Sequence, residues 1–229
     1  MFYKLIKKKC DEWLRSSECT IRELIQYIHA QNKMRDAQIE AIQIYLFLKI
    51  VCGNKPLWQL FSEGIFNSLD LNAMALTLEE RELFISNKGA AALLEYSLLK
   101  DKNGDQIAPE LEKFLKKRGA QIDYEAVFQK IFYGVTYTDY LFSLPMGAGK
   151  TYLMAAFIYL DLYFAQNEPD NPAFAHNFMV LAPSGLKSSI VPSLKNIQSF
   201  DPTWVIPEPT ASQLKRMIKF EILDEHDLS

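Results

Sequence analysis

The sequence predicts an α/β fold that begins near residue 134 and is preceded by an α-helical region over residues 1–133. In the first region, apolar residues recur at spacings of three and four, which is the period of a helix. From Gly134 onward a β-branched and aromatic stretch leads into a glycine-rich turn, a helical pattern and a second short apolar run. Strand, turn, helix and strand in this order predict parallel strands joined by a right-handed crossover.

The individual helices are expected where apolar periodicity and end signals coincide. Thr20 and Glu23 have the spacing of a capping box before a helix, and Gly53-Asn54 followed by Pro56 is typical of a helix end. Lys102-Asn103-Gly104-Asp105 predicts a turn. The expected helices start at about residue 21 and span about 35–51, 78–86, 90–100, 109–118 and 123–133.

Composition limits the function classes. The chain has 229 residues of which 49% are hydrophobic, enough for one large or two modest packed domains. A formal net charge of −3 argues against coating of nucleic acid by a global positive field, so any DNA or RNA contact is expected to be local.

The three cysteines are spaced like neither a disulfide framework nor a CxxC metal knuckle, and we expect reduced thiols. The basic run near the N-terminus lacks the apolar stretch of a secretory signal. The segment Tyr152 to Phe164 is interrupted by Asp161 and falls short of the ~20 residues that span a bilayer. We therefore expect a cytoplasmic protein with no membrane partner and no metal site beyond nucleotide-bound magnesium.

The glycine-rich turn, Met146-Gly147-Ala148-Gly149-Lys150-Thr151, has the parts of a phosphate-binding P-loop. Gly147 and Gly149 permit a backbone that converges its N–H groups on phosphate oxygens. The following helix presents its positive end, Lys150 is expected to reach the β and γ phosphates, and the Thr151 hydroxyl is expected to coordinate magnesium. These residues predict ATP and Mg²⁺ as cofactors. The alternative is a glycine-rich turn that only caps an ordinary helix.

The P-loop departs from the full GxxxxGK[ST] pattern at Leu144, where that pattern has glycine. Leu-Pro-Met-Gly-Ala-Gly-Lys-Thr at 144–151 resembles motif I of superfamily 2 DEAD/DEAH-type helicases and translocases. The closest likeness is to the N-terminal part of the ATPase subunit of type III restriction enzymes. This resemblance implies a RecA-like P-loop nucleotide-binding domain over 134–229, of which the chain holds only the N-terminal part, and ATP hydrolysis dependent on nucleic acid.

A second likeness lies after the predicted strand Phe178 to Ala182. The segment Phe178 to Lys187 resembles motif Ia of the same superfamily, which holds the backbone of one nucleic-acid strand. The resemblance implies that Pro183, Ser184 and Gly185 contact nucleic acid, with DNA and a modification or specificity subunit as partners. A strand end without a ligand is the alternative.

A third likeness is Met34 to Ile42, which resembles the upstream Arg-x-x-Gln helix of this superfamily. The resemblance implies that Gln38 reads the adenine edge. Gln38 lies much farther before Gly147 than the few tens of residues usual in the family. Gln129 is nearer but lacks the preceding arginine, and for either glutamine an ordinary helix-surface role is the alternative.

Asp224-Glu225-His226-Asp227 has the letters of a DExD/H box, the Walker B acids of the superfamily. The residues before it, Ser212 to Leu223, have helical rather than strand spacing, which favours a solvated helix end. Motifs III to VI and a second α/β domain are missing from the sequence, so we expect the front portion of a larger helicase or translocase. The competing hypotheses are a P-loop regulatory or scaffold module and a decayed fragment.

Overall fold

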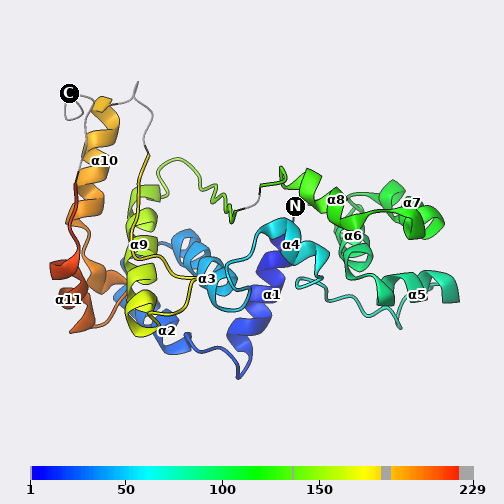
Figure 1. The fold of residues 1–229 in the computed structure, drawn as a ribbon, viewed down its shortest axis with the longest axis horizontal. Helices are drawn as coiled ribbons and strands as arrows, with labels where there is room; N and C mark the ends of the chain where they lie inside the picture. Colours follow the sequence, from blue (N-terminus) through cyan, green and yellow to red (C-terminus); the bar gives the residue numbers. More distant parts are fainter. Residues whose placement is uncertain (1, 136, 182–186, 222–229) are drawn as a thin grey trace. The chain divides into compact units, whose positions relative to one another are not determined.

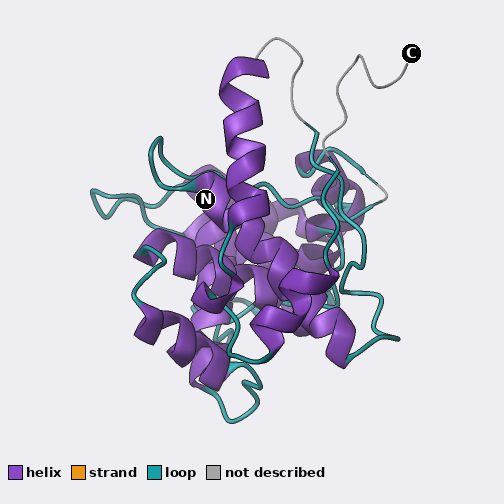
Figure 2. Ribbon diagram, turned by 90° about the vertical axis from the view of Figure 1, so that its left-hand side faces the viewer, coloured by secondary structure: helices purple, strands orange, loops and turns teal. Residues whose placement is uncertain are grey.

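The computed structural model describes residues 2–135, 137–181 and 187–221. It is 58% helical with 1% strand, and the described residues form no sheet. Figure 2 shows helices and loops with no strand drawn among them. Within the described ranges, the one β-type contact is an isolated antiparallel bridge between Lys100 and Gln106.

The expectation of an α/β, RecA-like fold is therefore wrong for the described residues. The predicted strands, Val135 to Phe142 and Phe178 to Ala182, are irregular or extended without a ladder wherever they are described. A strand has no hydrogen bonds of its own and forms only where a neighbouring backbone lies in register, whereas a helix pairs its own backbone locally. β-branched and aromatic residues supply the propensity but not the neighbour.

The chain folds as two compact units, each described here by itself. The first unit comprises Met1–Ser16 and Ile50–Leu141, and the second comprises Ser17–Lys49 and Phe142–Ser229. Residues 17–49, which the sequence places in the helical region ending at 133, thus belong to the same unit as the glycine-rich turn at residues 146–151. The domain boundary at 133/134 stays a prediction.

The first unit is made of short helices (Figure 1), and aromatic side chains pack between them. The Phe61 ring is fully buried, with its centroid 5.7 Å from that of Phe128 and 5.4 Å from that of Phe132. Offset aromatic contacts of this kind add to the burial of large apolar surface. The elements of this unit are α1 (Tyr3–Arg15), α4 (Leu57–Ser62), α5 (Leu78–Ser86), α6 (Lys88–Leu98), α7 (Pro109–Arg118), η1 (Gly119–Gln121) and α8 (Tyr124–Ile131).

Local end signals explain several of these boundaries. Thr77 and Glu80 form a capping box on α5, Asn87 caps α6 and Asp123 caps α8. The helices predicted at 78–86 and 109–118 are confirmed to the residue, and those predicted at 90–100 and 123–133 are confirmed with shifted ends.

The second unit is built on α9, whose apolar residues surround the whole helix. Such a helix is buried on most sides, and α9 packs against both α10 and α11 (Figure 1). Phe157 of α9 stacks on Tyr45 of α3 with ring centroids 4.1 Å apart. The elements of this unit are α2 (Arg22–Gln31), α3 (Asp36–Ile50), α9 (Lys150–Asn167), α10 (Lys187–Ser199), η3 (Pro202–Trp204) and α11 (Thr210–Met217). The last residue of α3, Ile50, is assigned to the first unit.

The predicted ends of α2 and α3 have different outcomes. The Thr20–Glu23 capping box is not formed, because α2 begins after Ile21 and has no side-chain cap. The predicted stop after α3 is confirmed, since Gly53 and Asn54 both take left-handed backbone conformations at φ +61° and +55°.

All three cysteines are buried and free of disulfides. Among the described residues, no helix combines the length and apolar character needed to cross a membrane.

Candidate nucleotide-binding site

The glycine-rich turn presents a helix N-terminus with unpaired donors. Gly147 and Gly149 have φ of +76° and +80°, conformations that side chains disfavour, and Gly149 is the N-cap of α9 without any side-chain cap. The first N–H groups of a helix have no partner within it and carry its positive end. Lys150 is exposed and Thr151 is half-buried at this end. The turn therefore offers amides, an ammonium and a hydroxyl to an anion.

The N-terminus of α3 contacts this turn directly. The Gln38 side chain donates from Nε2 to the Gly149 carbonyl at 2.8 Å, and the Arg35 guanidinium donates to the Gly147 carbonyl. A Cβ on Gly149 would lie 2.7 Å from Gln38 Nε2, closer than Cβ contacts come, so the Gln38 amide would have to shift. The hydrogen bond of Gln38 to the turn thus depends on glycine at 149.

The orientation of Gln38 follows from its place in α3. Gln38 is the third residue of the helix, and its Oε1 accepts the backbone N–H of Arg35 at 2.8 Å, the glutamine half of a capping box. Only 3% of Gln38 is exposed. The neighbouring Ile39 and Ile42 are buried and anchor this turn of α3 in the core.

A buried ion pair joins α3 to α9 farther along. Lys49 Nζ lies 3.0 Å from Asp161 Oδ2, and the two side chains are 9% and 1% exposed. Tyr45 donates its hydroxyl to Asp161 at 2.8 Å, and the Ala175 N–H donates to it at 3.1 Å. Lys49 also donates to the Ala173 carbonyl at 2.7 Å. Every member of the group is hydrogen-bonded, as buried charges require.

Sequence reasoning used Asp161 only as an interruption of an apolar run and missed this pair. A lone carboxylate among apolar residues of a buried helix needs a cationic partner, and that was the available signal. It indicates that a partner exists but does not identify Lys49.

Other predicted site residues lie elsewhere. Gln129 belongs to the first unit, where its amide donates to Glu125 one turn away at 3.3 Å. Pro183, Ser184 and Gly185 lie outside the described residues, as does the segment Asp224 to Asp227. The described part of the chain holds no group of three or more His, Cys, Asp or Glu side chains that suits a metal ion.

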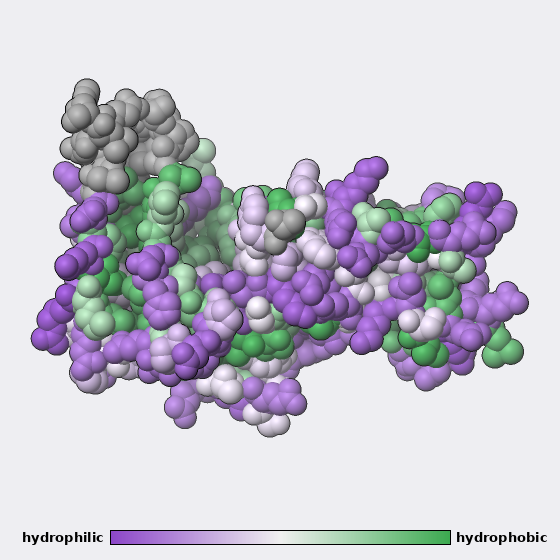
Figure 3. Space-filling model, viewed as in Figure 1, coloured by the Kyte–Doolittle hydropathy of each residue, from purple (hydrophilic) through white to green (hydrophobic). Residues whose placement is uncertain are grey.

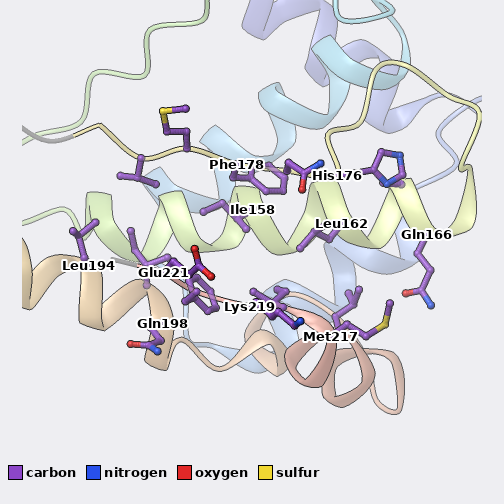
Figure 4. Close-up of a pocket in the computed structure, with 18 of the residues that line it drawn as sticks. Ile158, Leu162, Gln166, His176, Phe178, Leu194, Gln198, Met217, Lys219 and Glu221 are labelled. Carbon is purple, nitrogen blue, oxygen red and sulfur yellow. The ribbon is translucent and has the colours of Figure 1, made fainter. Parts of the chain in front are cut away.

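An apolar groove of about 1080 Å³ lies in the second unit, which also contains the glycine-rich turn (Figure 4). Ile158 and Leu162 of α9 line it, and residues 176–181 and 218–221, which lie outside the helices, contribute to its walls. Figure 3 shows hydrophobic surface over the α9–α10 region. Met179 and Leu181, from the strand predicted at Phe178 to Ala182, are 81% and 83% exposed. None of the residues 146–151 lines this groove, so it is distinct from the glycine-rich turn.

Comparison with protein-family models, with curated proteins and with solved structures finds no match to this chain. The helicase likeness therefore rests on the motifs at 34–42, 144–151 and 178–187.

Proposed function

We propose that the chain binds ATP with Mg²⁺ at the N-terminus of α9, as the nucleotide-binding portion of a nucleic-acid-dependent ATPase of the helicase or translocase class. The observation that carries the proposal is Gly149, left-handed at the start of α9, followed directly by Lys150 and Thr151. This arrangement places free amides, a lysine and a hydroxyl within one helical turn.

Each residue has a stated part in holding the nucleotide. The amides at the start of α9 donate to phosphate oxygens, and the Lys150 ammonium pairs with the β and γ phosphates. The Thr151 hydroxyl is the magnesium ligand, and Met146, Gly147 and Ala148 complete the turn. Magnesium, when bound, neutralises phosphate charge and orients the γ phosphate. Gln38 is the one residue of the set that comes from another helix.

The wider activity rests on the resemblance of the motifs. In the proposed protein, Pro183, Ser184 and Gly185 hold the backbone of a DNA strand, and a modification or specificity subunit completes the assembly. The affinity for a labelled oligonucleotide, measured with and without ATP, tests this part of the proposal.

The second candidate is a nucleotide-binding regulatory or scaffold module that does not move DNA. One observation favours this second candidate: among the described residues the P-loop is held by a hydrogen bond from helix α3, and no β-sheet is present to position it. ATP binding without any effect on oligonucleotide affinity supports this candidate, and ATP-dependent oligonucleotide binding supports the first.

Substitution of Lys150 tests the shared core of both candidates. Lys150→Ala should lower the affinity for a fluorescent ATP analogue by at least about tenfold, because it removes a charged hydrogen bond to phosphate. Lys195→Ala, which removes an exposed lysine of α10, is the matched control and should leave affinity unchanged. Equal affinity of Lys150→Ala and the parent chain would remove the P-loop assignment.

A further inference from the structure

Both polar atoms of the Gln38 side-chain amide make hydrogen bonds within the protein. Its Oε1 accepts the Arg35 N–H at 2.8 Å and its Nε2 donates to the Gly149 carbonyl at 2.8 Å. A glutamine that recognises the edge of adenine through two hydrogen bonds must supply one donor and one acceptor from its side-chain amide. Here Oε1 and Nε2 each already make one protein hydrogen bond, and Gln38 is only 3% exposed, so the remaining N–H and lone pair are not open to a base.

The carbonyl that Gln38 holds belongs to the peptide between Gly149 and Lys150. In a planar trans peptide the C=O and the following N–H point in opposite directions. Fixing the Gly149 carbonyl toward α3 therefore fixes the Lys150 N–H away from α3. That N–H is the first amide of α9, and the helix itself cannot pair it.

The same carbonyl also accepts the Leu153 N–H at 3.1 Å, which closes the first turn of α9. Gln38 thus acts on the residue where the turn becomes the helix. The capping hydrogen bond in α3 and the buried neighbours hold the Gln38 side chain in one rotamer, so its contact with Gly149 is rigid.

We infer that Gln38 is a positioning residue of the phosphate loop, which aims the Lys150 N–H at the phosphates and does not read the base. The inference rests on the proposed nucleotide binding. It assigns the Gln38 contribution to recognition of the phosphates instead of the base. Gln38 contacts the Gly149 carbonyl and acts on the triphosphate only through the Lys150 N–H, so its contribution is the same for every base.

Inorganic tripolyphosphate separates the two roles, because it carries the phosphates and no base. The experiment measures affinities of the full chain for Mg-ATP, Mg-CTP and Mg-tripolyphosphate by titration calorimetry, for the parent and Gln38→Met. Methionine has similar length and fills the buried site without a donor. Gln43→Met, at a half-buried position of the same helix, is the control. Gln38→Asn, whose amide is too short for both contacts, replaces the methionine variant if that variant does not fold.

The expected result is a loss of about two- to tenfold, the range for one ordinary hydrogen bond, by the same factor for all three ligands. Loss of ATP affinity alone overturns the inference and makes Gln38 a base reader. Unchanged tripolyphosphate affinity with a lower melting temperature assigns Gln38 a structural role and also overturns it. A parent chain that binds none of the three ligands removes the proposed function and the inference with it.

Discussion

Gly149 is glycine for two independent reasons. Its φ of +80° lies in the left-handed region, and its missing Cβ leaves room for Gln38 Nε2. Gly147 shares only the first reason, since a Cβ there meets nothing within 4 Å. A comparison of alanine substitutions at Gly147 and Gly149 therefore separates the free-energy cost of the left-handed backbone from the cost of the steric contact with Gln38.

Gly149→Ala should destabilise the chain more than Gly147→Ala. Each alanine costs about 1–2 kcal/mol for the left-handed backbone, and Gly149→Ala additionally displaces Gln38 from its hydrogen bond. Urea unfolding of both variants, alone and combined with Gln38→Ala, measures the difference. In the Gln38→Ala background the excess cost of Gly149→Ala should shrink, and a strictly additive result contradicts the contact.

Cys52 provides a pH-dependent prediction. Burial raises the pKa of its thiol to about 12, and Lys55 only partly offsets this. At about pH 8.5, near the ordinary pKa of a free cysteine, the folded thiol stays protonated while roughly half of the unfolded thiol is ionised. The stability from the neutral buried thiol is thus complete below that pH and declines as pH rises toward the folded pKa.

Iodoacetamide labelling at about pH 8.5, located by peptide mapping, checks this prediction. Cys52 should react slowly in the folded chain and quickly in urea. Equal rates in the two conditions contradict a buried, protonated thiol.

At the element scale, two polar contacts join α3 and α9 in addition to the stacking of Tyr45 on Phe157. The N-terminal contact is Gln38 with Gly149, and the second is the buried Lys49–Asp161 pair. A buried pair adds little net stability over apolar residues, but removal of one partner leaves an uncompensated charge. The pair therefore makes the alignment of the two helices specific.

Asp161→Ala should destabilise the chain by about 3–5 kcal/mol, because the Lys49 ammonium is left buried without a counter-charge. Glu110→Ala is the matched control. It breaks the ion pair with Lys113, in which the side chains are 72% (Lys113) and 81% (Glu110) exposed, and should destabilise the chain far less than Asp161→Ala does. Unfolding midpoints in urea give both values, and similar losses in the two variants contradict the role of the buried pair.

At the scale of the whole molecule, phosphate binding and phosphate hydrolysis have different requirements. Binding needs the turn and the start of α9. Hydrolysis also needs acidic residues for magnesium and the attacking water, and a cation at the γ phosphate. For the first need the sequence offers Asp224 and Glu225, which lie outside the described residues, and no motif is assigned to the second need.

We therefore expect the 229-residue chain to bind ATP but to hydrolyse it weakly, even with DNA and saturating Mg²⁺. An arginine finger alone contributes about 10³ to 10⁵ in rate. Steady-state phosphate release measures the turnover. DNA-stimulated turnover of about 1 s⁻¹ or faster, within the ordinary enzyme range, shows a complete catalytic set. Asp224 and Glu225 then become the acids, and Glu225→Gln should stop hydrolysis while ATP stays bound.

The sequence by itself determined the features that are local. The helix that starts at Lys150, the left-handed glycines before it and the helices with clear caps or stops depend on residues within a turn or two of one another. Helical periodicity and glycine conformations follow from backbone sterics and short-range hydrogen bonds, so a linear pattern is sufficient.

Only the tertiary structure decided which distant residues meet. It left the predicted strands unpaired among the described residues, joined Gln38 to Gly149 across 111 positions and matched Lys49 with Asp161. Such contacts depend on how buried faces pack and on whether a neighbouring backbone is present. Propensity does not encode either.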